Sequence, residues 1–168
     1  PKRPSPYSDS SKGDILKRGG RLRPPPHLLV RNGEDMALKI SLKPGEKIII
    51  SGAVVANGNA KSNLLIENRV PILREKDIMK EAAADTPCRR IYFVIQLMYI
   101  DEGNVVEYHN TYWNIVRDVM AAAPSTLGLI DPISEHILNG EYYKALKLTR
   151  KLIDYEEEAV KNARECGV

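Results

Sequence analysis

Cysteine, tryptophan and phenylalanine are scarce in this chain. Its 168 residues include two cysteines, one tryptophan and one phenylalanine. Cys88 and Cys166 lie far apart in the sequence, with no CxxC or Cys/His pattern around either, which argues against a disulfide framework or a zinc site. We expect two reduced thiols, no metal and no cofactor.

Long hydrophobic runs are also missing. No stretch approaches the roughly 18 apolar residues that a transmembrane helix needs. Near the start, charges and prolines never give way to an apolar block, so nothing there resembles a secretory signal. We therefore expect no membrane insertion and a cytoplasmic location.

Catalytic motifs cannot be found either. The sequence contains no GxSxG, Walker or GxGxxG pattern. Its histidines, His27, His109 and His136, are isolated from any metal-ligand spacing and are expected to be surface or packing residues. The chain is not expected to be an enzyme.

Residues 1–35 do not have the composition of a folded segment. Six of the eleven prolines fall there, and apolar residues are too few to offset the entropy of ordering. One interpretation is a disordered basic arm that reaches for RNA. We favour the other, an artefact of start-site choice with Met36 as initiator, because Gly33-Glu34 can be encoded by a purine-rich sequence like a ribosome-binding site.

Short apolar strands separated by turns follow, over residues 38–79. Apolar and polar side chains alternate at the start of this block, which predicts a strand with one apolar and one basic face. The alternating residues are Leu38, Lys39, Ile40, Ser41, Leu42 and Lys43.

Turn residues divide this block further. Pro44-Gly45 predicts a type II turn into the next strand. Asn57-Gly58 predicts a hairpin that joins Val54-Val55 to Leu64–Ile66. Pro71 cannot donate to a ladder and predicts an edge strand. A sheet this small must close into a barrel, pack on the helices or dimerise.

The rest of the chain has helical signals. Thr86-Pro87 predicts an N-cap and first helical residue, and Asn104 predicts the cap of the next helix. The run 91–100 is almost uniformly apolar, so a buried strand is an alternative there. The predicted class is α+β: a small N-terminal antiparallel β barrel or sheet over 36–80, followed by a helical bundle over 86–165.

Charge is distributed unevenly along the chain. Residues 1–35 and 36–90 each carry a surplus of +4, whereas residues 91–168 carry −5. A basic front predicts a surface for an anionic partner, with an ordinary solvated surface as the alternative. The predicted RNA contacts are Lys39, Lys43, Lys47, Lys61, Arg69, Arg74, Lys76, Arg89 and Arg90.

Two further points concern particular side chains. Among the cations, Arg74 is the preferred specific contact, because guanidinium stacks on bases and bonds their edges. Lysines on an exposed strand can instead protect its edge from aggregation.

In the tyrosine-rich helical half, Tyr142 and Tyr143 are adjacent and cannot both face inward, so one is predicted to contact a partner.

Four segments of the chain are similar to a known family. They are MALKISLKPGEKIIISGAVVANG, NRVPILREKDIM, RRIYFVIQLMYID and EYYKALKLTRKLIDYEEE, which together span Met36 to Glu158. In combination they resemble the FlbT family of flagellin-expression regulators. The resemblance implies a small cytoplasmic bacterial protein that binds the 5′ untranslated region of flagellin mRNA. It would act as a repressor that blocks translation or promotes mRNA decay.

The same resemblance implies protein partners. FlbT proteins commonly work with FlaF, a second small regulator. An alternative function is therefore a flagellar-assembly adaptor, or chaperone-like protein, whose helical half binds FlaF or flagellin. The tyrosine-rich helices and the acidic C-terminal third fit that alternative.

A fainter similarity links the strands to the CsrA translational regulators. SLKPGEKIIIS and PILREKDIM are similar to that family's first turn and basic final strand. This resemblance implies Lys43 and Arg74 as RNA contacts, with Leu42 and Leu73 beside them, and a strand-built dimer. The chain departs from the pattern at Pro44 and in its long helical half.

Overall fold

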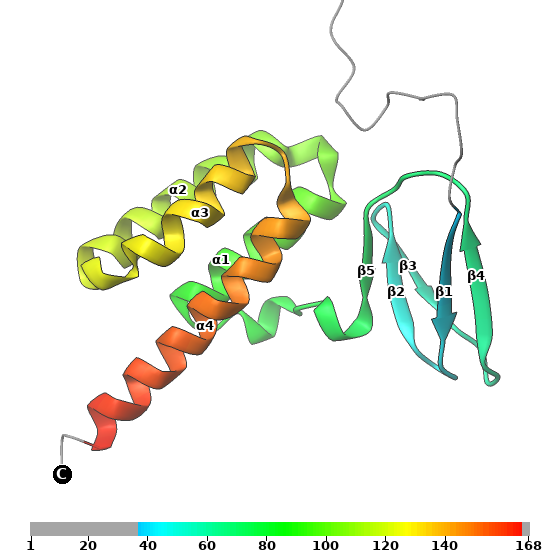
Figure 1. The fold of residues 1–168 in the computed structure, drawn as a ribbon, viewed down its shortest axis with the longest axis horizontal. Coiled ribbons are helices and arrows are strands. Elements are labelled where there is room, and N and C mark those ends of the chain that lie inside the picture. The colour runs from blue at the N-terminus through cyan, green and yellow to red at the C-terminus, as the bar shows by residue number, and fades with distance from the viewer. Residues whose placement is uncertain (1–36, 166–168) are drawn as a thin grey trace, which may run out of the picture. The chain divides into compact units, whose positions relative to one another are not determined.

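The computed structural model describes residues 37–165, so the predictions for the N-terminal arm lie outside it. These residues belong to one compact unit, 35–168 (Figure 1). The strands are β1 (Leu38–Leu42), β2 (Lys47–Ile50), β3 (Ala53–Ala56), β4 (Ser62–Ile66) and β5 (Ile72–Arg74). The helices are α1 (Pro87–Ile100), α2 (Val105–Ala122), α3 (Leu127–Leu138) and α4 (Tyr142–Glu165). Single 3-10 turns are η2 (Glu75–Asp77), η3 (Glu81–Ala83), η4 (Glu102–Asn104) and η5 (Pro124–Thr126).

The predicted α+β class is confirmed, and the ambiguous apolar run 91–100 is helix α1. Strands β1 to β5, here called the β unit, form two small antiparallel sheets. One sheet pairs β1 with β4, and the other has the order β3-β2-β5. β5 lies at an edge, as Pro71 predicted.

The hairpin predicted at Asn57-Gly58 is wrong. β3 pairs with β2 and β4 pairs with β1, so the chain at Asn57 crosses from one sheet to the other. The tight hairpin turn lies instead at Ser51 and Gly52, whose φ angles are 48° and 83°, as a two-residue loop of type I′ requires. A Cβ on Gly52 would lie 3.1 Å from the Ile100 carbonyl oxygen, so glycine also permits the close approach to α1.

β2 is buried on both faces. Ile48 packs with apolar side chains of β1, which places the two-stranded sheet against one face of β2. Ile49 points the other way and joins the helical core together with Leu73 of β5. Because successive side chains of a strand alternate between faces, one short strand connects both hydrophobic cores.

Polar contacts attach the segment after β5 to the helices. Buried Gln96 of α1 accepts from the Met79 backbone N–H at 2.7 Å and donates to the Met79 carbonyl at 2.9 Å. Tyr92 donates to the Asp77 carbonyl at 2.7 Å. Arg150 of α4 contacts the Asp77 carboxylate at 2.6 Å. The bonds from Gln96 and Tyr92 satisfy backbone groups of a segment that has no ladder partner.

The N-terminus of α1 is capped from two directions. Thr86 accepts from the Arg89 N–H at 3.3 Å, as the sequence predicted. Glu156 of α4 accepts hydrogen bonds from the Thr86 hydroxyl and from the Cys88 N–H. A carboxylate at this position also complements the helix dipole. Asn104 occupies the predicted N-cap position of α2, but its side chain makes no capping bond. Asp101 caps the preceding turn η4 by accepting from the Gly103 N–H.

Between residues 37 and 165, no helix is both long enough and apolar enough to cross a bilayer.

Replacing Gln96 tests the attachment of the β unit. Gln96→Leu leaves the N–H and the carbonyl of Met79 without partners, so we expect the free energy of unfolding to fall by about 2 kcal/mol. Urea denaturation followed by circular dichroism measures this. Asn110→Leu, on the exposed face of α2, is the control and should change stability little. Equal stability of the Gln96 variant and wild type would contradict the assigned role.

Candidate nucleic-acid interface

Two connecting segments lie side by side at one end of the β unit. The turn 43–46 and the loop 57–61 are joined by a hydrogen bond from Gly45 N–H to the Gly58 carbonyl, at 3.0 Å. A second bond runs from Asn57 N–H to the Glu46 carbonyl, at 2.9 Å. The two connections therefore form one hydrogen-bonded surface.

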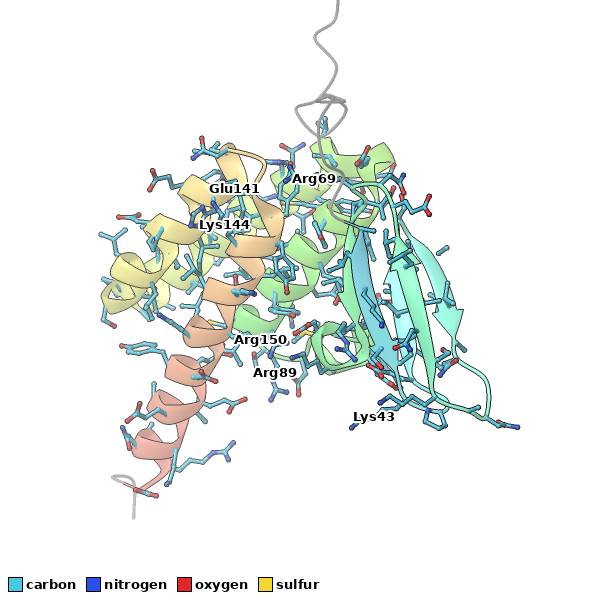
Figure 2. All side chains as sticks on the ribbon, turned by 45° about the vertical axis from the view of Figure 1, so that its right-hand side comes forward. Lys43, Arg69, Arg89, Glu141, Lys144 and Arg150 are labelled. Carbon is cyan, nitrogen blue, oxygen red and sulfur yellow. The ribbon has the colours of Figure 1, made fainter. Side chains whose placement is uncertain are left out.

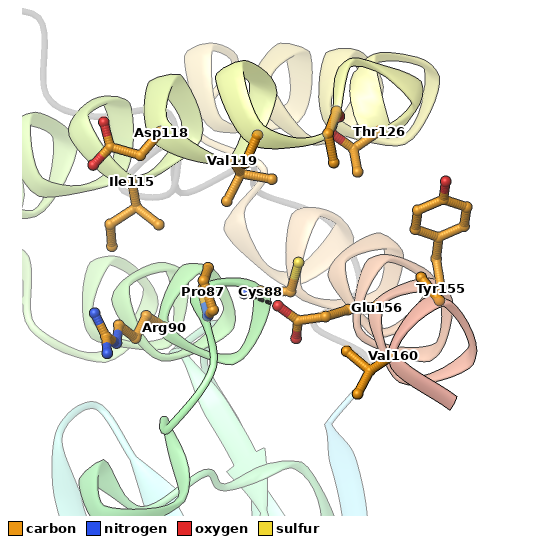
Figure 3. Close-up of a pocket in the computed structure, with 13 residues that line it drawn as sticks. Pro87, Cys88, Arg90, Ile115, Asp118, Val119, Thr126, Tyr155, Glu156 and Val160 are labelled. Carbon is orange, nitrogen blue, oxygen red and sulfur yellow. Dashed lines mark hydrogen bonds between the residues drawn. The ribbon is translucent and has the colours of Figure 1, made fainter. Parts of the chain in front are cut away.

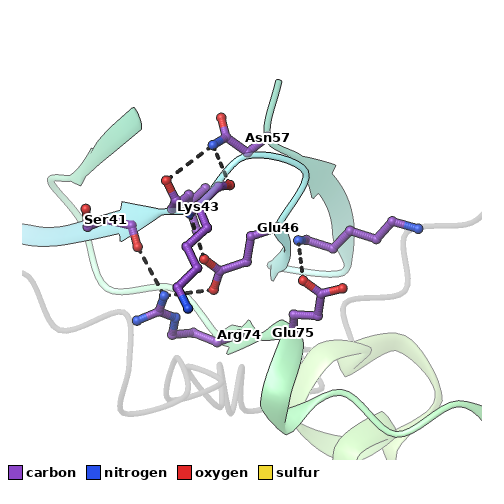
Figure 4. Close-up of polar contacts among 8 residues, drawn as sticks. Ser41, Lys43, Glu46, Asn57, Arg74 and Glu75 are labelled. Carbon is purple, nitrogen blue, oxygen red and sulfur yellow. Dashed lines mark hydrogen bonds and ion pairs between the residues drawn. The ribbon is translucent and has the colours of Figure 1, made fainter. Parts of the chain in front are cut away.

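Asn57 holds this surface together with its side chain. Its amide nitrogen donates to the carbonyls of Lys43 at 2.7 Å and Ala60 at 2.9 Å, and lies 3.3 Å from that of Leu42 (Figure 4). Its amide oxygen accepts from the Ser62 hydroxyl at 2.7 Å. The residue that suggested a hairpin turn is instead a bridge between two segments.

Three lysines lie on or next to these connections. We call Lys43, Lys47 and Lys61 the turn-end cluster. All three side chains are exposed, and none forms an ion pair with another residue of 37–165. With Arg74, Glu46 and Glu75 included, four cations face two carboxylates, which leaves a local charge of +2. Exposed, unpaired ammonium groups suit phosphate neutralisation.

Glu46 and Arg74 form the most enclosed ion pair at this end. Arg74 contacts the Glu46 carboxylate at 2.7 Å and donates to the Ser41 carbonyl at 3.1 Å. The Glu46 side chain is only 13% exposed. Its other oxygen accepts from the Lys43 N–H at 2.9 Å. This backbone hydrogen bond, followed by the bond to Arg74, lowers the pKa of Glu46 below its usual value.

Arg74 is thus held by the fold, although it was the preferred specific RNA contact. One terminal nitrogen bonds Ser41 and Glu46, and Nε is buried without a partner within residues 37–165. The guanidinium ties β5 to β1 and to the turn 43–46. Its contact with RNA stays a prediction that uses the exposed remainder of the side chain.

The other predicted contacts are dispersed. Lys39 lies on the exposed face of β1 and Lys43 directly follows that strand, whereas Lys47 starts β2 in the other sheet. Lys39 and Lys47 therefore belong to different sheets. Arg69 and Lys43 lie at opposite ends of the strands (Figure 2).

Three cations lie at the helices or next to them. Arg89 is paired with Asp85 at 3.0 Å and Glu157 at 2.9 Å. Arg90 is exposed on α1. Lys76 lies on η2, where its carbonyl accepts from Arg150 at 3.1 Å. The structure therefore places Lys43, Lys47 and Lys61 on or next to the two hydrogen-bonded connections, but it does not bring all nine predicted cations onto one surface.

The adjacent tyrosines face different surroundings. The Tyr142 hydroxyl lies 3.3 Å from Nε2 of His109. Tyr143 is 39% exposed, with its ring 5.7 Å from that of Tyr99 and the Lys147 ammonium 4.6 Å from its centroid. Tyr143 is thus the more exposed of the two.

Sequence reasoning overlooked a basic stretch on α4. Lys144, Lys147, Arg150 and Lys151 occur between residues 142 and 151, which contain no acidic residue. The net charge of residues 91–168 as a whole is negative, so it did not reveal these cations. A ten-residue window would have found this stretch.

An apolar groove lies between the start of α1, the second half of α2 and the second half of α4 (Figure 3). Its volume is about 300 Å³. The buried thiol of Cys88 lines it, and burial, with a smaller effect from Glu156, raises the pKa of this thiol to about 12. The thiol is therefore protonated at neutral pH and a poor nucleophile. Within the described part of the chain, no cluster of His, Cys, Asp and Glu is arranged to hold a metal ion.

Comparison with known proteins decides the family. A model of the family described as "Flagellar protein FlbT" matches residues 38–160. The chain belongs to the FlbT family. The match includes both the turn-end cluster and the apolar groove.

Individual FlbT relatives match nearly three quarters of the chain. A protein of Bradyrhizobium diazoefficiens, named probable flagellum biosynthesis repressor protein FlbT 1, is 48% identical over 124 residues, or 73% of this chain and 84% of the relative. The flagellum biosynthesis repressor protein FlbT of Caulobacter vibrioides is 44% identical over 125 residues, 73% of this chain and 89% of its own. A probable repressor of the same name from Brucella anthropi is 29% identical over 129 residues. No solved structure matches.

The Glu46 contacts predict a pH effect on stability. Because folding lowers the pKa of Glu46, its contribution is present above the unfolded pKa and is lost as pH falls through the folded value. Replacing Glu46 by Gln should therefore reduce stability at neutral pH, with a difference from wild type that shrinks below about pH 4. Urea denaturation between neutral and acid pH measures it. A difference that stays constant across this range would contradict the ionic role.

Proposed function

We propose that this protein regulates flagellin synthesis after transcription, by binding the 5′ untranslated region of flagellin mRNA. Membership of the FlbT family and the repressor names of the relatives support a flagellar regulator. As a repressor, the protein would block translation or promote decay of the bound transcript. It would act in the cytoplasm, by binding and without catalysis.

The turn-end cluster is the observation that carries the RNA proposal. Three lysines that form no ion pair within residues 37–165 lie next to two connections that are fixed by Asn57 and by the Glu46–Arg74 pair. A fixed backbone reduces the entropy lost when the lysines meet an anionic partner. Phosphate neutralisation by such groups would give affinity that falls steeply with salt.

Other groups near the cluster can add specificity. Asn59 is exposed between Asn57 and Lys61, and amide side chains bond base edges in single-stranded RNA. Lys39 extends the cationic surface along β1. The sequence resemblance to CsrA regulators points to the same turn through Lys43.

Neutralising two lysines tests this surface. For the double variant Lys43→Gln/Lys61→Gln, we expect weaker binding to a flagellin leader RNA and a log–log salt slope that is smaller by about 1.4, since each single-strand phosphate contact contributes about 0.7. Fluorescence anisotropy over a salt series measures both quantities.

The matched control is Lys147→Gln/Lys151→Gln, which removes the same charge from α4. It should retain the wild-type slope. Equal losses in the two double variants would indicate a nonspecific charge effect and would contradict the turn-end assignment.

A second candidate function, that of an adaptor for FlaF or flagellin, has its own observation. The helices expose large apolar side chains, including Val106 at 77% and Leu138 at 70%. Trp113 is also exposed on α2. Exposed apolar groups of this size suit a protein contact.

The adaptor candidate predicts selective loss of protein binding. Leu138→Lys should weaken the capture of purified FlaF or flagellin by the full chain, because a charge would enter the apolar contact. Leu65→Lys, at a similarly exposed leucine of β4, should retain capture. If neither partner binds the wild-type protein, this second function is excluded while the RNA proposal is unaffected.

A further inference from the structure

The apolar groove is exposed to solvent on the side that α4 forms. Ile115, Val119 and Ala122 line it from α2, and Ala159 and Val160 line it from α4 (Figure 3). Val160 is 45% exposed although it contributes to this wall. Small and β-branched side chains here leave room for a helix to approach closely.

The second half of α4 forms this wall with little support from the rest of the chain. All residues from Glu157 to Glu165 are exposed, and this part of α4 runs past the other helices (Figure 1). A solvated helical segment of this length is marginal on its own, because packing of an apolar face supplies most helical stability. The segment does have such a face, around Val160.

Charged residues lie on both sides of Val160 in the sequence. Glu156, Glu157 and Glu158 precede it, and Lys161, Arg164 and Glu165 follow it, with Lys161 and Glu165 paired at 3.9 Å. At 100° per residue, Glu156, Glu157 and Arg164 lie on the same side of the helix as Val160. A second copy of α4 that runs antiparallel across Val160 would place its Arg164 beside Glu156 and Glu157 of the first copy. The reciprocal contact follows from two-fold symmetry.

We propose that the groove and the second half of α4 form a two-fold interface between two copies of this chain. Val160 of each copy enters the groove of the other, next to Val119 and Ala122. Arg164 of each copy lies beside Glu156 and Glu157 of its neighbour. Charge complementarity selects the antiparallel arrangement, because parallel copies would set like charges together. This dimer goes beyond the RNA proposal and does not depend on it.

Existing contacts shape the proposed interface. Glu156 is fixed by Thr86 and the Cys88 N–H, and Glu157 by Arg89. Arg164 forms no ion pair with another residue of 37–165. The acidic side is thus held in place, whereas its cationic counterpart is available to the second copy.

Sedimentation equilibrium of the full chain, from nanomolar to high micromolar concentration, tests the dimer. We expect the wild-type mass to rise from monomer to dimer. Val160→Glu would bury an unpaired charge and should weaken dimerisation by about tenfold or more. Arg164→Glu should weaken it too, because the acidic blocks would then repel.

The matched control is Val106→Glu, at a valine exposed on the first turn of α2. It should dimerise as the wild type does, and circular dichroism should show equal helix content in all variants. A wild-type chain that stays monomeric throughout would overturn the proposal and leave the groove to a helix of another protein. Equal dimerisation of the Val160 and Val106 variants would overturn it as well.

A cross-link gives a second readout that does not depend on affinity. With Cys166→Ser as background, Val160→Cys should form a disulfide-linked dimer under mild oxidation, because the two copies of residue 160 meet near the symmetry axis. Val106→Cys should not. Equal cross-linking at both positions, or none at Val160→Cys, would contradict the two-fold geometry.

Discussion

The burial of β2 on both faces is the constraint on which the rest of the β unit depends. Ile48 faces the two-stranded sheet and Ile49 faces the helical core, so a shift of one residue would exchange the two sets. This alternation fixes the register with β3 and β5. It also fixes where β2 begins, and therefore where the turn 43–46 meets the loop 57–61.

The proposed function depends on side chains that take no part in the packing around β2. Packing is carried by isoleucines and leucines, and turn geometry by Asn57 and by the Glu46–Arg74 pair. Among the residues that the structure describes, the turn-end lysines therefore have no ion pair to lose when an anion binds. By contrast, the guanidinium groups of Arg89 and Arg150 already form ion pairs, which hold helices and connections together.

Local signals in the sequence predicted most element positions but not how the strands pair. Thr86-Pro87 marked the start of α1 because capping depends on adjacent residues. The hairpin prediction at Asn57-Gly58 was wrong because the Asn57 side chain bonds the Lys43 and Ala60 carbonyls. These bonds depend on a strand pairing that no local sequence pattern records. The contact between Arg74 and Glu46 joins residues that are 28 positions apart in the sequence, so no local pattern predicts it either. Exposed lysines could be predicted, whereas their grouping required the fold.

Chemical-shift mapping tests the central claim most directly. In a titration of the isotope-labelled full chain with a flagellin leader RNA, amide shifts should concentrate at the turn 43–46 and the loop 57–61. Amides of α2 and α3, whose buried side chains belong to the helical core, should change little. Shifts confined to the helices, with none at the two connections, would contradict the assignment of RNA binding to the turn-end cluster.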